Sequence, residues 1–288
     1  MTALCGIPFR KMNGLGNEFV VLDGRRDALP MSPALARSIA DRRSGIGCDQ
    51  VILMEASPRA DVRMRIWNND GSEVESCGNA SRCIADLLFS ETGRGTATID
   101  TKGGFLVCTR APEGQVTVDM GVPRFGWADI PLAEPFHDTR TIELQVGPID
   151  RPLLHSPSVV NVGNPHCIFW VDDVDAHDLG KFGPMLEYHP IFPERANISV
   201  CQVRGPNHLV LKVWERGAGL TRACGTAACA AAVAAARKDL TGRAVRVTLP
   251  GGDLDIVWRE SDDHILMTGP VAYEFTGELP EHLMAGAP

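Results

Sequence analysis

The stretch Trp67–Ala80, WNNDGSEVESCGNA, aligns without a gap with Trp214–Ala227, WERGAGLTRACGTA, at an offset of 147 residues (214 − 67). Six identical pairs share this register, namely Gly16/Gly163, Asn17/Asn164, Trp67/Trp214, Cys77/Cys224, Gly78/Gly225 and Ala80/Ala227. With a slip of one residue, Gly103-Gly104 also matches Gly251-Gly252. An internal repeat of this length predicts two homologous domains of one fold, which we expect to be related by a pseudo-twofold axis.

Each repeat contains the same succession of strand, polar loop and apolar helix. Before each tryptophan, apolar residues alternate with other residues, as at Val62, Met64 and Ile66, which is the period of a half-buried strand. After each Cys-Gly pair, apolar residues follow helical spacing through 80–88, and an alanine-rich segment fills 227–237. The sequence therefore predicts an α/β (α+β) fold class with a central, apolar helix in each half.

The segments that flank the repeat give the remaining elements. Ser32-Pro33 begins an amphipathic helix that we expect to end near Gly45, and 178–188 is its weaker counterpart. Short strands and hairpins are predicted at 98–108, 115–121, 245–258 and 264–274.

Length agrees with two domains, because 288 residues exceed one domain of the usual size. We expect the boundary near the proline-rich stretch 123–135. The N-terminal domain is assigned to 1–121 and is completed by a C-terminal strand at about 270–288. The C-terminal domain is assigned to 122–269.

The charge balance excludes several classes of partner. Lys and Arg number 28 against 36 Asp and Glu, so the formal net charge is −8. Nucleic acids and anionic membranes both select basic surfaces, and we expect neither as a partner. The most apolar run, 223–236, is too short to span a bilayer. These features predict a soluble, non-secreted, cytoplasmic protein.

The nine cysteines are dispersed over the chain, unlike those of short disulfide scaffolds, and an odd number cannot be fully paired. We expect most of them to be buried, reduced thiols. They are Cys5, Cys48, Cys77, Cys83, Cys108, Cys167, Cys201, Cys224 and Cys229.

Cys77 and Cys224 differ from the other cysteines because each stands where a polar loop enters a helix and is followed by glycine. A helix N-terminus favours thiolate over thiol, so we expect a lowered pKa at both, and its free N–H groups bind carboxylates. Two such thiols on opposite sides of a carbon are what a cofactor-free racemase or epimerase requires. One thiolate removes a proton while the other thiol delivers one to the opposite face.

The chain resembles the diaminopimelate epimerase family over essentially its whole length. The resemblance lies in KMNGLGNEFVVLD, GIGCDQ, IWNNDGSEVESCGNASRC, VGNPHC, PERANI, WERGAGLTRACGTAACA and MTGP, in this order. It implies interconversion of LL- and meso-diaminopimelate for lysine and peptidoglycan precursor biosynthesis, without PLP, another cofactor or a metal. It also implies a mixed or antiparallel sheet wrapped around a central helix in each domain, an active site in the interdomain cleft, and a homodimer.

Site residues follow from the same resemblance. Cys77 and Cys224 are implied as the acid–base pair, and His166 and Glu215 as the residues that assist them, one near each thiol. By itself, His166 is more simply a structural histidine. The implied substrate contacts are Asn17, Gln50, Asn68, Asn164, Asn197, Glu215 and Arg216, with the backbone of Gly78-Asn79 and Gly225-Thr226 holding the reacting carboxylate. A guanidinium such as that of Arg216 can grip the distal carboxylate bidentately.

The sequence departs from the family pattern at three positions. Ala80 and Ala227 replace the second glycine after each cysteine, and Leu220 stands where many relatives have Glu. None of the three is a proposed acid, base or carboxylate clamp.

Three alternatives stay open at this point. The first is another epimerase of the same doubled fold that acts on a proline derivative, although a monocarboxylate would leave Arg216 and the Asn cluster unpaired. The second is a thiol–disulfide or metal protein, which the spacings 77–83 and 224–229 do not favour. The third is a binding module without catalysis.

Overall fold

The computed structural model describes residues 6–75 and 77–284. The chain forms two compact units. The first comprises the chain up to Val118 together with the segment from Gly269 onward, and the second comprises Asp119–Thr268. Each unit is a mixed α/β structure built on one main sheet, and the second unit also contains a separate two-stranded sheet.

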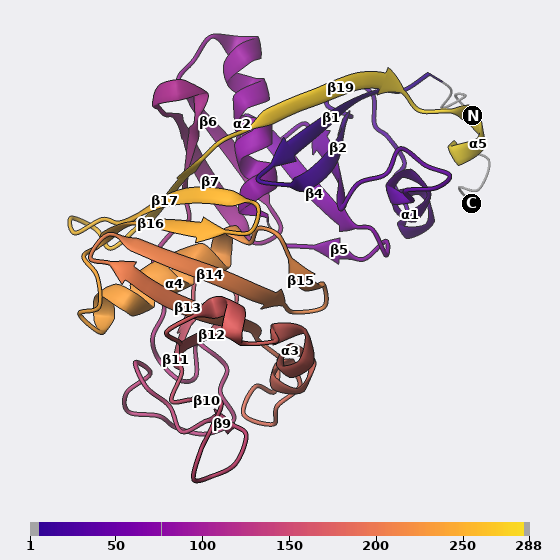
Figure 1. Ribbon diagram of the computed structural model, residues 1–288. Helices are drawn as coiled ribbons and strands as arrows, with labels where there is room; N and C mark the ends of the chain where they lie inside the picture. Colours follow the sequence, from indigo (N-terminus) through magenta and orange to yellow (C-terminus); the bar gives the residue numbers. More distant parts are fainter. Residues whose placement is uncertain (1–5, 76, 285–288) are drawn as a thin grey trace. The chain divides into compact units, whose positions relative to one another are not determined.

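The elements of the first unit are β1 (Pro8–Gly14), β2 (Asn17–Asp23), α1 (Pro33–Ala40), β3 (Gln50–Glu55), β4 (Val62–Asn68), β5 (Glu73–Val74), α2 (Gly78–Thr92), β6 (Thr96–Thr101), β7 (Gly104–Arg110), the 3-10 turn η1 (Pro112–Gly114), β19 (Ala272–Glu278) and α5 (Glu281–Met284). Its strands pair in the order β19-β1-β2-β3-β4-β6-β7, with β5 also on β4. The β2/β3 and β4/β6 pairs are parallel, and the others are antiparallel. Figure 1 shows β19, from the end of the chain, beside β1.

The elements of the second unit are β9 (Gln145–Val146), β10 (Leu154–His155), β11 (Ser158–Asn161), β12 (Pro165–Trp170), the 3-10 turn η2 (Val174–Ala176), α3 (Leu179–Glu187), β13 (Asn197–Gly205), β14 (His208–Glu215), β15 (Gly219–Thr221), α4 (Gly225–Arg237), β16 (Ala244–Leu249) and β17 (Gly252–Trp258). β8 (Val116–Asp119) and β18 (Ile265–Gly269) each contain a boundary between the units. The main strands pair in the order β11-β12-β13-β14-β16-β17-β18, with β15 also on β14.

Strand register reproduces the sequence repeat. Val51 pairs with Trp67 in the first unit, and Ile198 pairs with Trp214 in the second, which is the offset of 147 on both strands. The parallel pairs also correspond, because β2/β3 and β4/β6 match β12/β13 and β14/β16. Val62 pairs with Ile99 and Leu209 with Val247, so the slip of one residue falls after the central helix. The matching strand pairs of the two units therefore confirm the predicted duplication.

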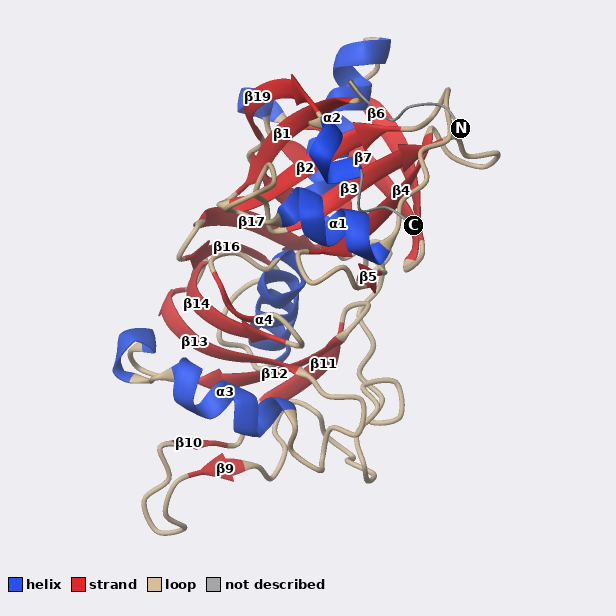
Figure 2. Ribbon diagram, turned by 90° about the vertical axis from the view of Figure 1, so that its right-hand side faces the viewer, coloured by secondary structure: helices blue, strands red, loops and turns tan. Residues whose placement is uncertain are grey.

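Each sheet carries the predicted apolar helix on one face. α2 buries Ala80, Cys83, Ile84, Leu87 and Leu88, and contacts β1, β6 and β7. α4 is buried along nearly its whole length and contacts β11, β12, β14, β16 and β17. Figure 2 shows the strands of the second unit curving around α4. Alanine suits this position because it combines the highest helix propensity with a small side chain that lets strands approach closely.

The opposite face of each sheet is covered by the shorter helices α1 and α3. Leu35 and Ile39 of α1 pack with Val51, Leu53 and Trp67 in one apolar cluster. Leu179 and Leu186 of α3 share a cluster with strand residues of β12 and β13. Side chains alternate between the two faces along a strand, so burial on both faces requires the nearly continuous apolar strands β3 and β13.

Two expectations from sequence were wrong. The first helix ends at Ala40 and not near Gly45, because the Asp41 carboxylate accepts hydrogen bonds from the backbone of Arg43 and Ser44 and closes a turn. The proline-rich stretch 123–135 does not contain the boundary. Its residues Ile130 and Leu132 are buried in the core of the second unit, and Arg124 forms a β-bridge with Asn161.

Gly183 of α3 provides a test of the packing between α3 and β14. A Cβ at this position would lie 2.4 Å from Cγ of Trp214. Helix propensity alone predicts that Gly183→Ala stabilises by about 1 kcal/mol, whereas overpacking costs about 1–3 kcal/mol. We expect the clash to prevail and the free energy of unfolding in urea to fall.

Gly95→Ala is the matched control, because no heavy atom other than those of Gly95 and its two chain neighbours lies within 4 Å of its Cβ position. We expect a change within about 0.5 kcal/mol there. Equal stabilities of the two variants would contradict the close approach of Trp214 to α3.

Candidate active site

Both cysteines of the repeat are N-cap residues of the central helices. Cys77 precedes α2 with φ −149° and ψ 112°, and Cys224 precedes α4 with φ −130° and ψ 109°. Neither of these fully described helices carries an acidic residue in its first turn. The backbone N–H groups of Gly78-Asn79 and Gly225-Thr226 therefore lie at the positive helix ends, where a carboxylate can bind.

Cys77 is half-buried and is surrounded by amide side chains. Its Sγ donates to Oδ1 of Asn17 at 3.8 Å, and Nδ2 of Asn79 donates to the same oxygen at 3.4 Å. Nδ2 of Asn17 in turn donates to Oδ2 of Asp49 at 3.2 Å. Because Asp49 accepts from the amide nitrogen, it orients the oxygen of Asn17 toward the thiol.

Gln50 and Asn68 face each other as directly paired residues of β3 and β4. Nε2 of Gln50 donates to Oδ1 of Asn68 at 2.9 Å, and Nδ2 of Asn68 donates to Oγ of Ser72 at 3.2 Å. The buried Oε1 of Gln50 has no hydrogen-bond partner among the described residues. This oxygen can accept a hydrogen bond from a ligand amine.

Cys224 is buried and lies beside Glu215 and Thr226. Its thiol hydrogen-bonds to the Glu215 carboxylate, and its Sγ lies 3.4 Å from Oγ1 of Thr226. The hydroxyl of Thr221 donates to Oε1 of Glu215. Thr221 and Leu220 are neighbours on β15, so their side chains point to opposite faces, and Leu220 is exposed. The departure at Leu220 therefore does not enter the group around Cys224.

The expected lowering of the thiol pKa is wrong for Cys224. Burial raises the pKa of this thiol well above its usual value, and the charge of Glu215 raises it further. Burial likewise raises the pKa of the Glu215 carboxyl. Desolvation thus outweighs the helix dipole, and Cys224 is held as a neutral thiol that donates to Glu215.

His166, Asn164, Asn197 and Arg216 form a second group in this unit. Nε2 of His166 lies 2.8 Å from Oδ1 of Asn164, and His166 is paired with Asn197 across β12 and β13. Oδ1 of Asn197 accepts from the backbone N–H of Arg216 at 2.9 Å. Nη1 of Arg216 donates to the carbonyl of Glu194 at 2.9 Å. The amide of Asn197 therefore links the strand of the histidine to the residue that carries the guanidinium.

The His166 ring is fully buried and neutral. Burial, with a smaller effect from the charge of Arg216, lowers its pKa to about 3. Because the Asn164 oxygen can only accept, Nε2 carries the proton and Nδ1 is a free acceptor, which has no partner within the described part of the chain. A buried, unpaired Nδ1 can accept a proton or a hydrogen bond from a bound molecule.

The structure thus brings the predicted residues together within each unit, around Cys77 and in the Gln50–Asn68 pair of the first unit, and around Cys224 and around His166 in the second. Asn17 and Asn79 lie at Cys77, while Glu215 and Thr226 lie at Cys224. In the described second unit, His166 bonds to Asn164 and not to Cys224. Sequence reasoning missed Asp49 and Thr221. The signals were present, because Asp49 directly precedes Gln50 in GIGCDQ, and Thr221 closes the hairpin that returns to Glu215.

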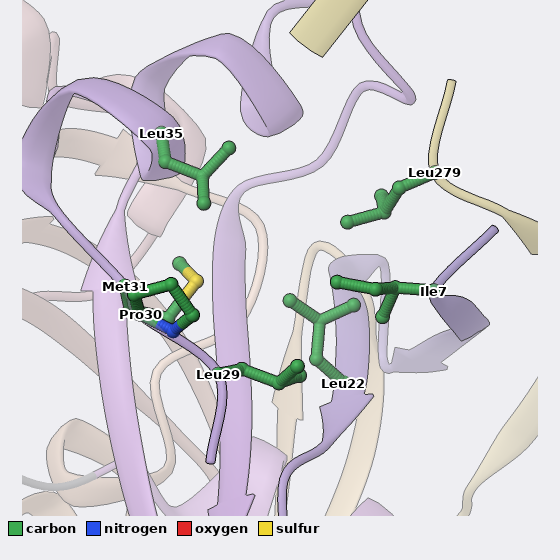
Figure 3. A pocket seen from close by; sticks show the side chains of 7 residues that line it. All are labelled: Ile7, Leu22, Leu29, Pro30, Met31, Leu35 and Leu279. Carbon is green, nitrogen blue, oxygen red and sulfur yellow. The ribbon is translucent and has the colours of Figure 1, made fainter. Parts of the chain in front are cut away.

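A small pocket in the first unit is unsuited to a charged amino acid. Figure 3 shows its lining of Ile7, Leu22, Leu29, Pro30, Met31, Leu35 and Leu279, all of them apolar. Within residues 6–75 and 77–284 there is no cluster of side chains that could hold a metal ion and no helix long and apolar enough to cross a membrane. No disulfide bond joins the cysteines of these ranges to one another, and Cys5 lies outside them.

Comparison with known proteins gives a full-length match. A family model described as diaminopimelate epimerase matches residues 9–126 and 158–274. A diaminopimelate epimerase of Rhodopseudomonas palustris is 56% identical over 288 residues, which cover 99% of this chain and 97% of the relative. One of Afipia carboxidovorans is 55% identical, with 99% of both chains covered.

Solved structures share the fold at low sequence identity. A phenazine biosynthesis protein of the PhzF family from Bacillus anthracis has a TM-score of 0.66 at 17% identity, and covers 94% of this chain and 98% of its own. A hydroxyproline epimerase from Agrobacterium vitis has a TM-score of 0.65 at 14% identity, covering 95% of this chain and 92% of its own. At these identities the likeness shows the fold alone.

The buried His166 predicts a pH dependence of stability. Its pKa is about 3 in the folded chain against about 6.5 when unfolded, so between these values the unfolded state binds one more proton. The free energy of unfolding should then fall as the pH falls below 6.5, by up to about 1.4 kcal/mol per pH unit from this residue.

In His166→Gln this contribution is removed, and urea unfolding between pH 4.5 and 7 should show a correspondingly flatter curve. Parallel curves for the wild type and the variant would contradict the neutral, buried state of the histidine.

Proposed function

The chain belongs to the diaminopimelate epimerase family and is an isomerase of diaminopimelate, and we propose that Cys77 and Cys224 are its two acid–base groups. This activity implies a role in lysine biosynthesis, and we extend it to the supply of peptidoglycan precursors. One observation carries the proposed residue roles: both cysteines are the N-caps of the central helices in corresponding repeats. Each thiol is therefore next to backbone donors for a carboxylate.

The reaction needs no cofactor in this proposal. One cysteine, as thiolate, takes the α-proton, and the C–H electron pair stays on the substrate, where the helix N–H groups stabilise the charge that builds on the carboxylate. The other cysteine, as thiol, gives its proton to the opposite face, and its S–H electron pair stays on sulfur. The product has the inverted configuration, and the two sulfurs have exchanged protonation states.

The surroundings of Cys224 suit the role of the acid in the resting protein. Its thiol is buried and donates to Glu215, so Cys77 is the sulfur that we assign as resting base. Gly78-Asn79 and Gly225-Thr226 would hold the reacting carboxylate from the two helix ends. His166, with its free Nδ1, and Glu215 would assist proton movement at the two thiols.

The distal amino acid end of the substrate requires a separate set of polar groups. Arg216 supplies a guanidinium for its carboxylate, and we assign Asn17, Gln50, Asn68, Asn164 and Asn197 to the remaining polar contacts. In the repeat alignment Arg216 corresponds to Asn69. A cation in only one repeat is appropriate for a substrate whose two ends are bound differently.

The wider organisation is part of the same proposal. A carbon can be approached by two sulfurs from opposite faces only if both helix ends reach one cleft, so we place the site between pseudo-twofold-related domains at 1–121 with about 270–288, and at 122–269. We also propose a homodimer that acts in the cytoplasm, as the family resemblance supports. Light scattering of the purified protein tests the homodimer.

Turnover of LL-diaminopimelate in deuterated water, without added PLP or metal, tests the two-base mechanism. We expect meso product with deuterium at the inverted α-carbon, because the delivering thiol exchanges with solvent. Retention of the original hydrogen at that carbon would show that one base acts on both faces. No turnover by the pure protein would contradict the proposed mechanism as a whole.

Replacement of either proposed acid–base cysteine should remove activity without unfolding the chain. In Cys77→Ala and in Cys224→Ala we expect kcat to fall by at least about 10²–10⁴-fold, with circular dichroism unchanged. Cys201→Ala is the matched control, since Cys201 is a buried thiol of β13 away from the helix ends. Near-normal turnover in either test variant would refute the two-base assignment.

Arg216→Met tests recognition of the distal carboxylate. The variant loses a charge-assisted hydrogen bond of about 1.5–3 kcal/mol, so kcat/KM for diaminopimelate should fall by roughly 10–150-fold. The measurement is steady-state kinetics with the LL isomer. An unchanged kcat/KM would refute the proposed role of Arg216.

A further inference from the structure

Glu187 is a buried carboxylate that the proposed reaction does not use. It is the last residue of α3 and is 3% exposed. The C-terminal end of a helix carries partial negative charge, so a buried anion there is unfavourable unless other groups compensate it. The side chains and backbone groups that compensate Glu187 therefore indicate its purpose.

The Glu187 carboxylate accepts hydrogen bonds from the two residues that flank Glu215-Arg216 in the chain. Its Oε2 accepts from Nε1 of Trp214 at 2.7 Å, and its Oε1 accepts from the backbone N–H of Gly217 at 3.0 Å. Gly217 has φ +77°, a left-handed conformation that glycine adopts at little cost. Glu187 thus fixes the end of β14 and the turn that follows it.

The same carboxylate reaches the segment that holds the guanidinium of Arg216. Nη1 of Arg195 lies 3.9 Å from Oε1 of Glu187, and the preceding carbonyl, that of Glu194, accepts from Nη1 of Arg216 at 2.9 Å. The Arg195 guanidinium also lies 4.3 Å over the ring of Tyr188. Both segments that place Arg216 are therefore connected through Glu187.

We propose that Glu187 is a positioning residue for Arg216, and that it sets the affinity for the distal carboxylate without touching the substrate. This inference rests on the proposed role of Arg216. A structural ion pair with Arg195 does not account for the arrangement, since Arg195 is half-exposed and such pairs contribute little. What distinguishes a carboxylate here is that each of its oxygens accepts one of the two hydrogen bonds.

Glu187→Gln is the informative variant because an amide has one acceptor oxygen and must lose one of the two bonds. We expect KM for LL-diaminopimelate to rise by roughly 3–10-fold, as for one lost hydrogen bond, with kcat within about two-fold. Trp214→Phe removes only the indole donor and leaves the charge of Glu187 in place. It should raise KM in the same direction if Glu187→Gln proves too unstable to assay.

Asp175→Asn is the matched control. Asp175 lies in η2 and forms an exposed ion pair with Lys212, which is on β14, the strand of Trp214. None of its hydrogen bonds or ion pairs within the described residues involves Arg216. We expect its KM and kcat to equal those of the wild type.

A double-variant cycle with Arg216→Met separates positioning from a merely structural role. If Glu187 acts through Arg216, the double variant Glu187→Gln/Arg216→Met should have the same KM as Arg216→Met alone. An equal rise of KM in both backgrounds, or a loss of kcat with unchanged KM in Glu187→Gln, would overturn the inference. An unchanged KM in Arg216→Met alone would instead overturn the role of Arg216, and the inference with it.

Discussion

The N-cap position of a helix buried against its own sheet is the constraint on which the rest of each unit depends. A thiol at this position is held by the backbone of the cap and stands beside N–H groups that have no intrahelical partner. The helix can be buried only if it is apolar on nearly all sides, which explains the alanine-rich α4. The sheet can surround such a helix only if its strands curve. The helix also lies in the crossover connection between two parallel strands, α2 between β4 and β6 and α4 between β14 and β16.

The duplication gives the two units equivalent backbone positions, and differences in residue type at these positions give the units different chemical properties. Phe19, Asn68 and Asn69 of the first repeat correspond to His166, Glu215 and Arg216 of the second. Every one of these exchanges replaces an apolar or neutral group by an ionisable one, so at these three positions the ionisable group belongs to the second unit. The opposite exchange occurs in the central helix, where the buried Arg82 of α2 corresponds to Cys229 of α4. The cysteines therefore occupy equivalent backbone positions in unequal electrostatic surroundings.

The sequence predicts what is periodic or repeated and fails where burial decides. The offset of 147 residues correctly predicts that the two units repeat one fold, and the equivalent pairs Val51/Trp67 and Ile198/Trp214 agree with it. It does not reveal that the proline-rich 123–135 packs into the second core, since prolines mark a linker and a buried irregular segment alike. Nor does it give the protonation of Cys224, which depends on Glu215 and on desolvation by distant strands. The sequence around Glu187 likewise does not predict its hydrogen bonds to Trp214 and Gly217, because these partners are distant along the chain.

The raised pKa of the Cys224 thiol, opposite to the expectation from sequence, bears on how the proposed mechanism works in both directions. A helix end favours thiolate by a fraction of a charge, whereas complete burial costs several kcal/mol, so the resting thiol keeps its proton. Once Cys224 has delivered its proton it is a thiolate next to Glu215, as the reverse reaction requires, and two adjacent buried anions would be strongly unfavourable. The raised pKa of Glu215 resolves this, because a carboxyl that readily holds a proton can be the neutral member when the sulfur is charged. Because Cys224 gives the proton of the pair to the substrate, the Glu215 carboxyl must take up one proton from solvent at that stage and release it when Cys224 is protonated again. Asn68, the counterpart of Glu215, has no ionisable group to share in this way, which makes the pair specific to the second repeat.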